Sequence, residues 1–237
     1  MIEVVGYKGV VGGATYEWLC KMQPCPVVGR DMGDPAPSYR DGRVSFICVP
    51  EAVVPSVAKD AASYAEFLVI RSTVKPGTCR ALQDKLKIHI CHVPEFLREV
   101  SAVQDEFNPN FIVIGACCNV HAEYLSNIYK NAQCRVVITD TATSELVKLA
   151  VNNYLSCLIS YWNEFEKVAQ AAGSNGHRVG AIASLDPRIS TYGARYHHKF
   201  GGKCLPKDLK QIREYALELN ITTPLFDAIE EVNECAR

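Results

Sequence analysis

The stretch KFGGKCLPKDL, residues 199–209, holds the residue types and spacing in this chain that most directly suggest chemistry. Cys204 follows two glycines and a lysine and precedes Pro-Lys-Asp, which sets a thiol near the ammonium of Lys207 and the carboxylate of Asp208. A lone cysteine is more often a small buried apolar residue than a nucleophile. Cys204 therefore has to be judged together with the other polar groups of the chain.

A second set of polar groups lies on a long predicted helix. No proline or glycine interrupts residues 144–172, and apolar residues repeat there at helical spacing. Thr141 and Thr143 are possible caps of its start, and Gly173 is its predicted end. Lys148 and Asn152 are four residues apart, so they project from one face, one turn apart. By themselves they are ordinary solvated residues, although an ammonium can stabilise an oxyanion and a carboxamide can both donate and accept.

A glycine-rich turn between a strand and a helix occurs in IEVVGYKGVVGGATYEWLC, where such a turn presents backbone N–H groups to a pyrophosphate. Gly9 and Gly12 take the second and third glycine positions of G-x-G-x-x-G, whereas Tyr7 stands in the first and Gly6 one position earlier. Tyr7 predicts a distorted turn or a different approach to a cofactor, and a turn without any ligand is the alternative. Asp31 lies 19 residues after Gly12, where a carboxylate favours NAD over NADP.

Composition excludes several classes of protein. The chain has 237 residues, 48% of them apolar, with 25 Lys and Arg against 26 Asp and Glu. Without a basic block, neither nucleic acid nor an anionic membrane is expected as a partner. No apolar run of roughly 18 residues and no signal peptide is recognised, so we expect no membrane association and a cytoplasmic protein. The eleven cysteines lack the spacing of a disulfide framework or a zinc site, so we expect mostly buried free thiols and no metal.

The order of the predicted elements gives the fold class. Short β-branched runs alternate with helical stretches in the first part of the chain, which predicts a parallel sheet covered by helices. The predicted strands are IEVVG, CPVVGRD, VSFICVP, FLVIRST, KIHICHV and NFIVIGA. The pattern changes near Thr139, and further helices are predicted from Asp208 to about Leu219 and from Pro224 onward. We predict an α/β protein: a Rossmann-like parallel-sheet domain, residues 1–138, followed by an all-α domain built on one long helix, residues 139–237.

Five motifs in order resemble the UDP-glucose/GDP-mannose dehydrogenase family. They are RSTVKPGT (71–78), HVPEFLREV (92–100), TSELVKLAVNN (143–153), DPRI (186–189) and FGGKCLPKD (200–208), with Asn108-Pro109 and IVIG (112–115) between them. The resemblance implies oxidation of C6 of a nucleotide-activated hexose, UDP-hexose favoured, from alcohol to carboxylate with two NAD⁺ per turnover. It also implies a homodimer through the long helix 144–172, and a product such as UDP-glucuronate for polysaccharide synthesis.

The resemblance also implies a role for individual residues. Cys204 would be the nucleophile, forming a thiohemiacetal and then a thioester, and Lys207 would favour its thiolate. Lys148 and Asn152 would bind the reacting oxygen and a water, oriented by Asp208. Glu95 would be an acid/base or water-activating group, and Thr73 would position water. The implied cofactor-binding residues are Gly6, Gly9, Val10, Val11, Gly12, Arg30, Asp31, Val49, Pro50, Ser72, Thr73 and Lys207. The implied substrate-binding residues are Glu95, Phe96, Leu97, Arg98, Lys148, Asn152, Phe200, Gly201, Cys204 and Arg188, the last reaching the hexose of the neighbouring subunit.

The sequence departs from the family pattern in places. Members are usually longer, with a third, C-terminal nucleotide-binding domain, so we expect a short form without it. The crossover at residues 32–43 is contracted. Val93, Lys203 and Leu205 stand where asparagine, serine and phenylalanine are common.

Two other functions stay open at this point. A single-step β-hydroxyacid dehydrogenase also combines a glycine turn with Lys-x-x-x-Asn on a long helix, but it has no use for Cys204. A degenerate nucleotide-binding module without turnover would explain Tyr7 and the short crossover. It would not explain why a nucleophile and an acid/base set occur together.

Overall fold

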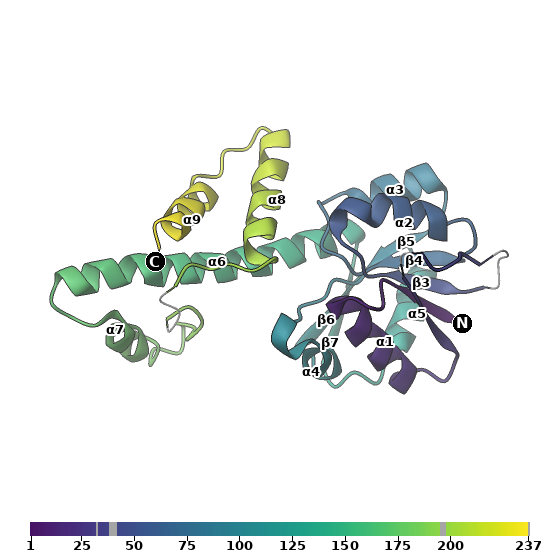
Figure 1. Ribbon diagram of the computed structural model, residues 1–237, viewed down its shortest axis with the longest axis horizontal. Helices are drawn as coiled ribbons and strands as arrows, with labels where there is room; N and C mark the ends of the chain where they lie inside the picture. The colour runs from purple at the N-terminus through teal and green to yellow at the C-terminus, as the bar shows by residue number, and fades with distance from the viewer. Residues whose placement is uncertain (32, 38–41, 195–197, 237) are drawn as a thin grey trace. The chain divides into compact units, whose positions relative to one another are not determined.

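Seven short strands form one sheet in the computed structural model, which describes residues 1–31, 33–37, 42–194 and 198–236 (Figure 1). The strand order is β2-β1-β3-β4-β5-β6-β7, and every neighbouring pair is parallel except β5 and β6. The strands are β1 (Ile2–Val5), β2 (Val27–Arg30), β3 (Val44–Ile47), β4 (Phe67–Ile70), β5 (Ile90–His92), β6 (Phe111–Gly115) and β7 (Arg135–Thr139). The six predicted strands are confirmed, and the sheet is mostly rather than wholly parallel.

Strand β7 was not predicted. It lies at the edge of the sheet, where Arg135 is exposed and Ile138 keeps 54% of its surface.

Helices cover both faces of this sheet. Alternate strand residues point to opposite faces, so Val4, Phe46 and Val69 pack with Trp18 of α1, while Ile47, Leu68 and Ile70 pack against the other layer. The helices on the first face are α1 (Val10–Met22) and α5 (Asn119–Ile128), with α4 (Ala102–Phe107) beside α1, and those on the second are α2 (Val54–Ala61) and α3 (Thr78–Leu86). Short 3₁₀ turns, η1 (Glu51–Val53) and η2 (Glu99–Ser101), precede α2 and α4. The result is the three-layer Rossmann-like arrangement that the sequence predicted.

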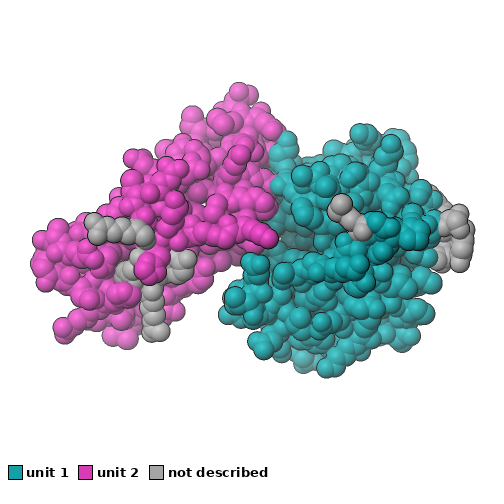
Figure 2. Space-filling view, in the orientation of Figure 1, with its two compact units in different colours: residues 1–148 teal, residues 149–237 magenta. Residues whose placement is uncertain are grey.

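A long helix, α6 (Thr141–Ala171), joins this sheet unit to a helical unit. The chain divides into Met1–Lys148 and Leu149–Arg237 (Figure 2). The sequence predicted a boundary after residue 138, whereas the structure divides inside α6, after Lys148. The reason is that the first two turns of α6 are held by the sheet unit, as described below. The start of α6 is capped by Asp140, whose carboxylate accepts the Thr143 backbone N–H at 2.8 Å. The caps expected at Thr141 and Thr143 are therefore wrong.

The described residues of the second unit contain helices and no strand. They are most of α6, α7 (Gly176–Ala183), α8 (Leu205–Glu218) and α9 (Pro224–Glu234). Gly173 ends α6 with a φ of +74°, as predicted, and its N–H bonds to the Gln170 carbonyl. Helix α7 was not predicted, although Asn175 caps it by accepting the Arg178 N–H at 3.0 Å. A small apolar core of Ile159, Phe200, Leu209 and Ile229 holds α6, α8 and α9 together.

Two further expectations can be compared with the structure. All eleven cysteines are free thiols, but only Cys48, Cys79 and Cys91 are buried, so the expectation that most are buried was wrong. Across the described part of the chain, none of the helices is both long enough and apolar enough to span a bilayer.

Candidate functional site

The glycine turn after β1 is closed tightly by its own backbone. Gly6 has a φ of +88°, a conformation that side chains oppose, and the Gly9 N–H donates to the Gly6 carbonyl at 3.0 Å. A Cβ on Gly12 would lie 2.0 Å from that same carbonyl oxygen. Gly9 is the N-cap of α1 and supplies no side-chain cap, so the first N–H groups of the helix are left for another acceptor.

Tyr7 does not distort this turn. The positive φ falls on Gly6 instead, and the Tyr7 ring packs over Gly29 of β2, where an added Cβ would lie 2.5 Å from the ring. A second aromatic contact joins Tyr7 to Tyr16 of α1, with ring centroids 5.5 Å apart. The turn therefore keeps a positive-φ glycine directly after the strand, one position earlier than in the usual motif.

The turn fits the pyrophosphate of a dinucleotide. Val10 begins α1 and is half exposed, Val11 is partly buried, and the uncapped N–H groups stand at the positive end of the helix dipole. A cavity of about 450 Å³ lies here, lined by Gly9, Val10 and Gly13 on one side and by residues 99–104 on the other. Asp31 follows β2, and its carboxylate accepts the Lys8 backbone N–H at 3.0 Å, which places it beside the turn.

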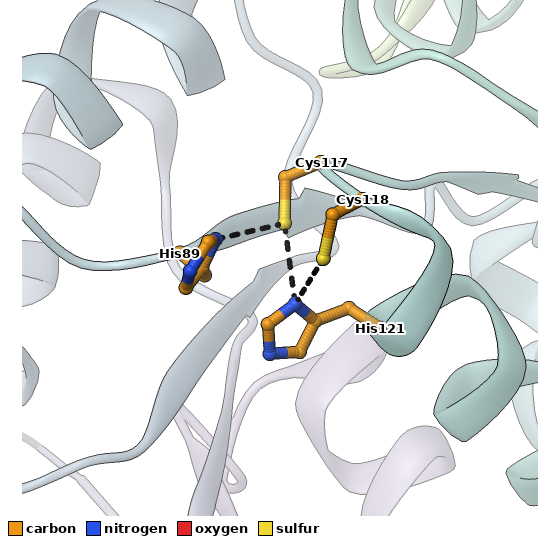
Figure 3. Close-up of side chains that lie close together, drawn as sticks. All are labelled: His89, Cys117, Cys118 and His121. Carbon is orange, nitrogen blue, oxygen red and sulfur yellow. Dashed lines mark hydrogen bonds between the residues drawn. The ribbon is translucent and has the colours of Figure 1, made fainter.

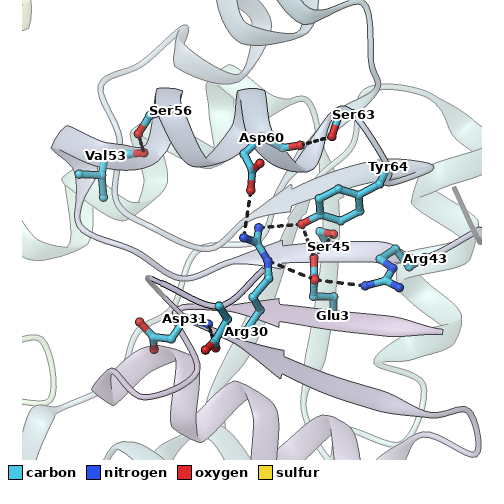
Figure 4. A network of polar contacts seen from close by, with 11 residues as sticks. Glu3, Arg30, Asp31, Arg43, Ser45, Val53, Ser56, Asp60, Ser63 and Tyr64 are labelled. Atoms are coloured by element: carbon cyan, nitrogen blue, oxygen red, sulfur yellow. Dashed lines mark hydrogen bonds and ion pairs between the residues drawn. The ribbon is translucent and has the colours of Figure 1, made fainter. Parts of the chain in front are cut away.

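Arg30 belongs to a buried polar network (Figure 4). Its guanidinium contacts Asp60 at 2.9 Å, the Tyr64 hydroxyl at 2.7 Å and Glu3 at 3.4 Å. Glu3 is 1% exposed in the middle of the sheet, and it also accepts from Tyr64 at 2.8 Å and from Arg43 at 3.3 Å. The Arg30 side chain, implied to bind cofactor, is thus held by structural partners. Its backbone carbonyl accepts the Gly6 N–H at 2.8 Å.

The loops after β3 and β4 are fixed to each other. Ser72 donates its hydroxyl to the Val49 carbonyl at 2.6 Å and accepts the Val49 N–H at 3.2 Å. Pro50 follows as the N-cap of η1, and Thr73, half-buried, follows Ser72. Four residues implied to bind cofactor therefore come together at the carboxyl ends of two adjacent parallel strands, where ligands of open α/β sheets bind.

The sheet unit buries an ion pair at the end of β5. Lys148 Nζ lies 3.1 Å from Glu95 Oε1, and both side chains are at least nine-tenths covered. The other Glu95 oxygen accepts the Leu97 N–H at 2.7 Å, and the Phe96 ring lies 5.3 Å from the ammonium. Two residues from separate motifs are thus brought together, and each would leave a buried charge if its partner were removed. The sequence alone could not distinguish this pair from surface groups.

The first turns of α6 are held on the sheet by side chains that the sequence analysis quoted but did not single out. Glu145 accepts the N–H groups of Gly77 and Cys79, at 2.5 and 2.8 Å, at the start of α3. Ser144 lies against Gly115 of β6, where a Cβ would be 2.5 Å from the serine Cβ. Burial raises the pKa of Glu145, although the two backbone N–H groups oppose that rise.

His92 lies directly behind the ion pair. Its Nε2 is 3.3 Å from the Ser72 carbonyl, which only an N–H can satisfy, so Nδ1 accepts from the Ser144 hydroxyl at 2.9 Å. Burial lowers the pKa of His92, and the positive charges of Arg71 and Lys148 add to this effect, so that the pKa is about 4. His92 therefore fixes the β4 loop and α6 as a neutral side chain, a role that its place in HVPEFLREV did not reveal.

Arg71 and Arg98 hold the segments around this site. The buried Arg71 donates to Glu106 at 2.8 Å and to the Tyr129 hydroxyl at 2.9 Å. Arg98, implied to bind substrate, is 76% exposed but forms a two-bond pair with Asp105, which holds the pKa of that carboxyl well below its usual range. Leu97 and Phe96 are half-buried.

The second unit contains the other polar cluster. Asn152 donates to Asp208 Oδ2 at 2.6 Å, and Asp208 is fully buried. Its second oxygen lies 2.6 Å from Lys207 Nζ. Cys204 is the exposed N-cap of α8, and the Asp208 N–H bonds to the Cys204 carbonyl at 2.9 Å. The thiol thus stands at a helix N-terminus, an environment that favours a thiolate.

The other substrate-binding residues predicted in this unit, Phe200, Gly201 and Arg188, have other surroundings. Phe200 is 2% exposed and packs in the core of the helical unit, with its backbone held by Asn233 at 2.7 and 3.1 Å. Because the Phe200 side chain is buried, residues 200–201 could contact a substrate only through their backbone or at the exposed Gly201. Arg188 is 86% exposed and pairs with Asp186 at 2.6 Å. Of the contracted crossover at residues 32–43, residues 32 and 38–41 lie outside the described residues.

Comparison with known proteins gives the class of this fold and site. The UDP-glucose/GDP-mannose dehydrogenase NAD binding domain matches residues 33–133, and the central domain of the same family matches residues 142–235. The chain belongs to the UDP-glucose/GDP-mannose dehydrogenase family and carries its NAD-binding domain.

Individual relatives agree with this. The chain is 34% identical to the UDP-glucose 6-dehydrogenase of Rickettsia conorii, over 71% of this chain and 40% of that protein. It is 27% identical to the GDP-mannose 6-dehydrogenase of Pseudomonas savastanoi, over 85% and 49%. A solved UDP-glucose dehydrogenase from Pyrobaculum islandicum superposes with a TM-score of 0.84 at 27% identity, covering 99% of this chain and 68% of that one. The chain spans about half or less of the length of the two curated relatives.

Proposed function

We propose that this chain performs the NAD-dependent oxidation of the C6 alcohol of a nucleotide sugar, a UDP-hexose in preference, to the carboxylate. One observation carries the proposal: the four polar residues predicted to act around the reacting carbon are buried and paired with each other. Glu95 pairs with Lys148 of α6. One turn further along α6, Asn152 pairs with Asp208 of α8. Burying such groups is costly, so their retention supports chemistry rather than packing.

The first oxidation uses the charge of Lys148. Its ammonium stabilises the negative charge that develops on the C6 oxygen as the hydroxyl proton leaves for a base, with Glu95 as the nearest carboxylate. Bound NAD⁺ accepts one hydride in each of the two oxidations. The product of the first step is an aldehyde.

The second oxidation uses Cys204. Its thiolate adds to the aldehyde carbon and forms a thiohemiacetal, which loses a hydride to become a thioester. Water then cleaves the C–S bond, which releases the carboxylate and regenerates the thiol. The balance is one alcohol, one water and two NAD⁺ giving one carboxylate, two NADH and three protons. Asn152 and Asp208 would orient the water or the reacting oxygen.

The test compares wild-type chain with Cys204→Ser, and uses Cys235→Ser as the control because Cys235 is another exposed thiol of the same unit. Incubation with NAD⁺ and UDP-glucose, GDP-mannose, UDP-GlcNAc or UDP-ManNAc should give two NADH per sugar acid in the wild type and the control. Cys204→Ser should form no acid.

Other outcomes of this test favour the other functions. Turnover that is unchanged in Cys204→Ser, with one NADH per product, would favour a single-step dehydrogenase. Absence of NADH with every sugar, alongside calorimetric NAD⁺ binding, would favour a binding module.

A further inference from the structure

Four metal-binding side chains gather at one end of the sheet in the first unit. The Nδ1 or Nε2 atoms of His89 and His121 and the Sγ atoms of Cys117 and Cys118 all lie within 4.8 Å of one another (Figure 3). Cys117 Sγ is 3.6 Å from His89 Nδ1 and 3.5 Å from His121 Nδ1, and Cys118 Sγ is 2.9 Å from His121 Nδ1. Such a set combines two soft sulfurs with two imidazole nitrogens.

The fold itself brings these residues together. Strands β5 and β6 are antiparallel with His92 opposite Gly115, and continuing that register puts His89 opposite Cys118. Cys118 is the N-cap of α5, and His121 lies in the first turn of that helix. Because His89 precedes β5 and Glu95 follows it, the cluster lies at the opposite end of this strand from the proposed catalytic pair.

We propose that His89, Cys117, Cys118 and His121 form a tetrahedral binding site for Zn²⁺. With Zn–S bonds of about 2.3 Å and Zn–N bonds of about 2.0–2.1 Å, the sulfur–nitrogen edge of a tetrahedron is about 3.6 Å. The two contacts of Cys117 Sγ already have this length, and all four ligand atoms lie within 4.8 Å of one another. Two thiolates and two imidazoles select zinc over magnesium or calcium, which prefer oxygen ligands.

The surroundings of the cluster support the same site. Cys91 is buried, and its Sγ lies 3.6 Å from Cys117 Sγ, so it can hold that ligand in place from outside the metal shell. The His121 ring is fixed by Phe67 and His89, with centroids 4.3 and 4.7 Å apart.

No metal was expected because the chain has no Cys-x-x-Cys pair with suitably spaced histidines. The sequence signal of the proposed zinc site is Cys-Cys-x-x-His at residues 117–121. The fourth ligand, His89, directly precedes β5, the strand antiparallel to β6. The register of β5 with β6 was needed to find it. The site shares no residue with the proposed dehydrogenase machinery, so either proposal can fail without the other.

The first experiment uses the wild-type chain, reduced and stripped with a chelator. In competition with a chromogenic chelator, it should bind about one Zn²⁺ per chain. Co²⁺ in place of Zn²⁺ should give the intense visible bands of tetrahedral cobalt and a thiolate charge-transfer band. A pale octahedral cobalt spectrum, no competition for zinc, or oxidation of Cys91 and Cys117 to a disulfide that zinc does not prevent would overturn the site.

Variants then assign the ligands. Cys118→Ser and His121→Asn should each weaken zinc binding by more than about 100-fold, and Cys91→Ala by about tenfold, as for an outer-shell group. Cys134→Ser is the matched control, a half-buried thiol of the same unit outside the cluster, and should bind as wild type. Equal zinc affinity in all four variants would place the metal elsewhere and reject the assignment.

A footprint on the wild type covers the case in which a variant fails to fold. Zinc should slow the alkylation of Cys117 and Cys118 at least about tenfold, while Cys20, exposed on α1, stays equally reactive with and without the metal. Cys117 and Cys118 that react equally fast in both conditions would overturn the proposal.

Discussion

His92 shows how one buried side chain can set the pH range in which the site is formed. It is fully buried between the β4 loop and α6, and donates to one and accepts from the other. Arg71 and Lys148 add positive charge nearby, so an imidazolium here would be both desolvated and repelled. The folded chain therefore keeps His92 neutral, whereas the unfolded chain lets it titrate normally.

This difference predicts the direction of a pH effect on stability. The pKa of His92 falls from the ordinary 6.5 to about 4 in the folded state. Between these values the unfolded chain binds more protons, so the free energy of unfolding is highest above pH 6.5 and falls as the pH drops towards 4. The loss reaches about 1.4 kcal/mol per pH unit and on the order of 3 kcal/mol in total.

Urea unfolding at several pH values, with a chelator present, measures this effect. The wild type should lose stability below pH 6.5 more steeply than His92→Gln, which cannot take up the proton. His177→Asn, a change at an exposed histidine of the other unit, should follow the wild type. Parallel curves for wild type and His92→Gln would contradict the assignment.

At the scale of elements, the turn between β1 and α1 depends on one close approach. The Gly12 Cα hydrogen faces the Gly6 carbonyl, and an added Cβ would lie 2.0 Å from that oxygen. Gly12→Ala must therefore push α1 away from β1, and we expect it to cost about 1–3 kcal/mol of unfolding free energy and to weaken NAD⁺ binding. Denaturant unfolding and calorimetry measure the two effects.

The neighbouring glycine is the matched comparison for stability. A Cβ on Gly13 would lie 3.3 Å from the Tyr7 carbonyl oxygen, which a small adjustment relieves, and alanine favours the helix by up to about 1 kcal/mol. Gly13→Ala should therefore be neutral or stabilising. A Gly12→Ala chain as stable as Gly13→Ala would show that the turn is looser than the described contact requires.

Elements also show which parts of the fold could be predicted from sequence. The long helix and six of the seven strands carry strong apolar patterns, and all were found, including the partly buried edge strand β2. Strand β7 and helix α7 were missed because β7 is half exposed at an edge and α7 is short and follows a run of helix-breaking residues. The antiparallel direction of β6 relative to β5 could not be predicted from the residues of the strand. Strand direction depends on the path that the connecting segment takes across the sheet.

The sequence motifs singled out the residues of the candidate site but not the pairs that these residues form. The motifs named Glu95, Lys148, Asn152 and Asp208. The Glu95–Lys148 pair depends on α6 reaching the sheet, whereas the Asn152–Asp208 pair depends on the packing of α8 with α6. The docking of α6 on the sheet depends on Glu145 and Ser144, whose contacts with Gly77 and Gly115 join positions far apart in sequence. No pattern along the chain marks such long-range contacts, so these supporting residues appear only in the fold.

At the scale of the whole molecule, one face of α6 in the helical unit is left exposed by the described residues of the chain. In the helical unit, Leu149, Ile159 and Trp162 are buried. Another set stays exposed at spacings of seven, four and three residues: Tyr154 at 61%, Tyr161 at 54%, Phe165 at 37% and Val168 at 60%. These spacings place the four side chains along one stripe of the helix. Exposed aromatic stripes of this kind mark interaction sites.

We propose this stripe, residues 154–168, as the contact surface of the homodimer that the family resemblance implies. Two copies of one helix can bury the same stripe against each other about a two-fold axis. Replacing two of its aromatic rings, Tyr161→Ser with Phe165→Ser, should weaken self-association by more than about 100-fold, since each buried aromatic contributes about 1.5–3 kcal/mol. Leu217→Ser, a change at a 71% exposed residue of α8 outside the stripe, is the control.

Light scattering over a range of concentrations measures the outcome. Wild type and Leu217→Ser should have the mass of a dimer, and the double variant the mass of the 26.2 kDa chain. Unchanged circular dichroism would show that the double variant still folds, because both rings are solvent-exposed in the single chain. A wild-type chain that stays monomeric at high concentration, or a double variant that still dimerises, would exclude this face of α6 as the dimer contact.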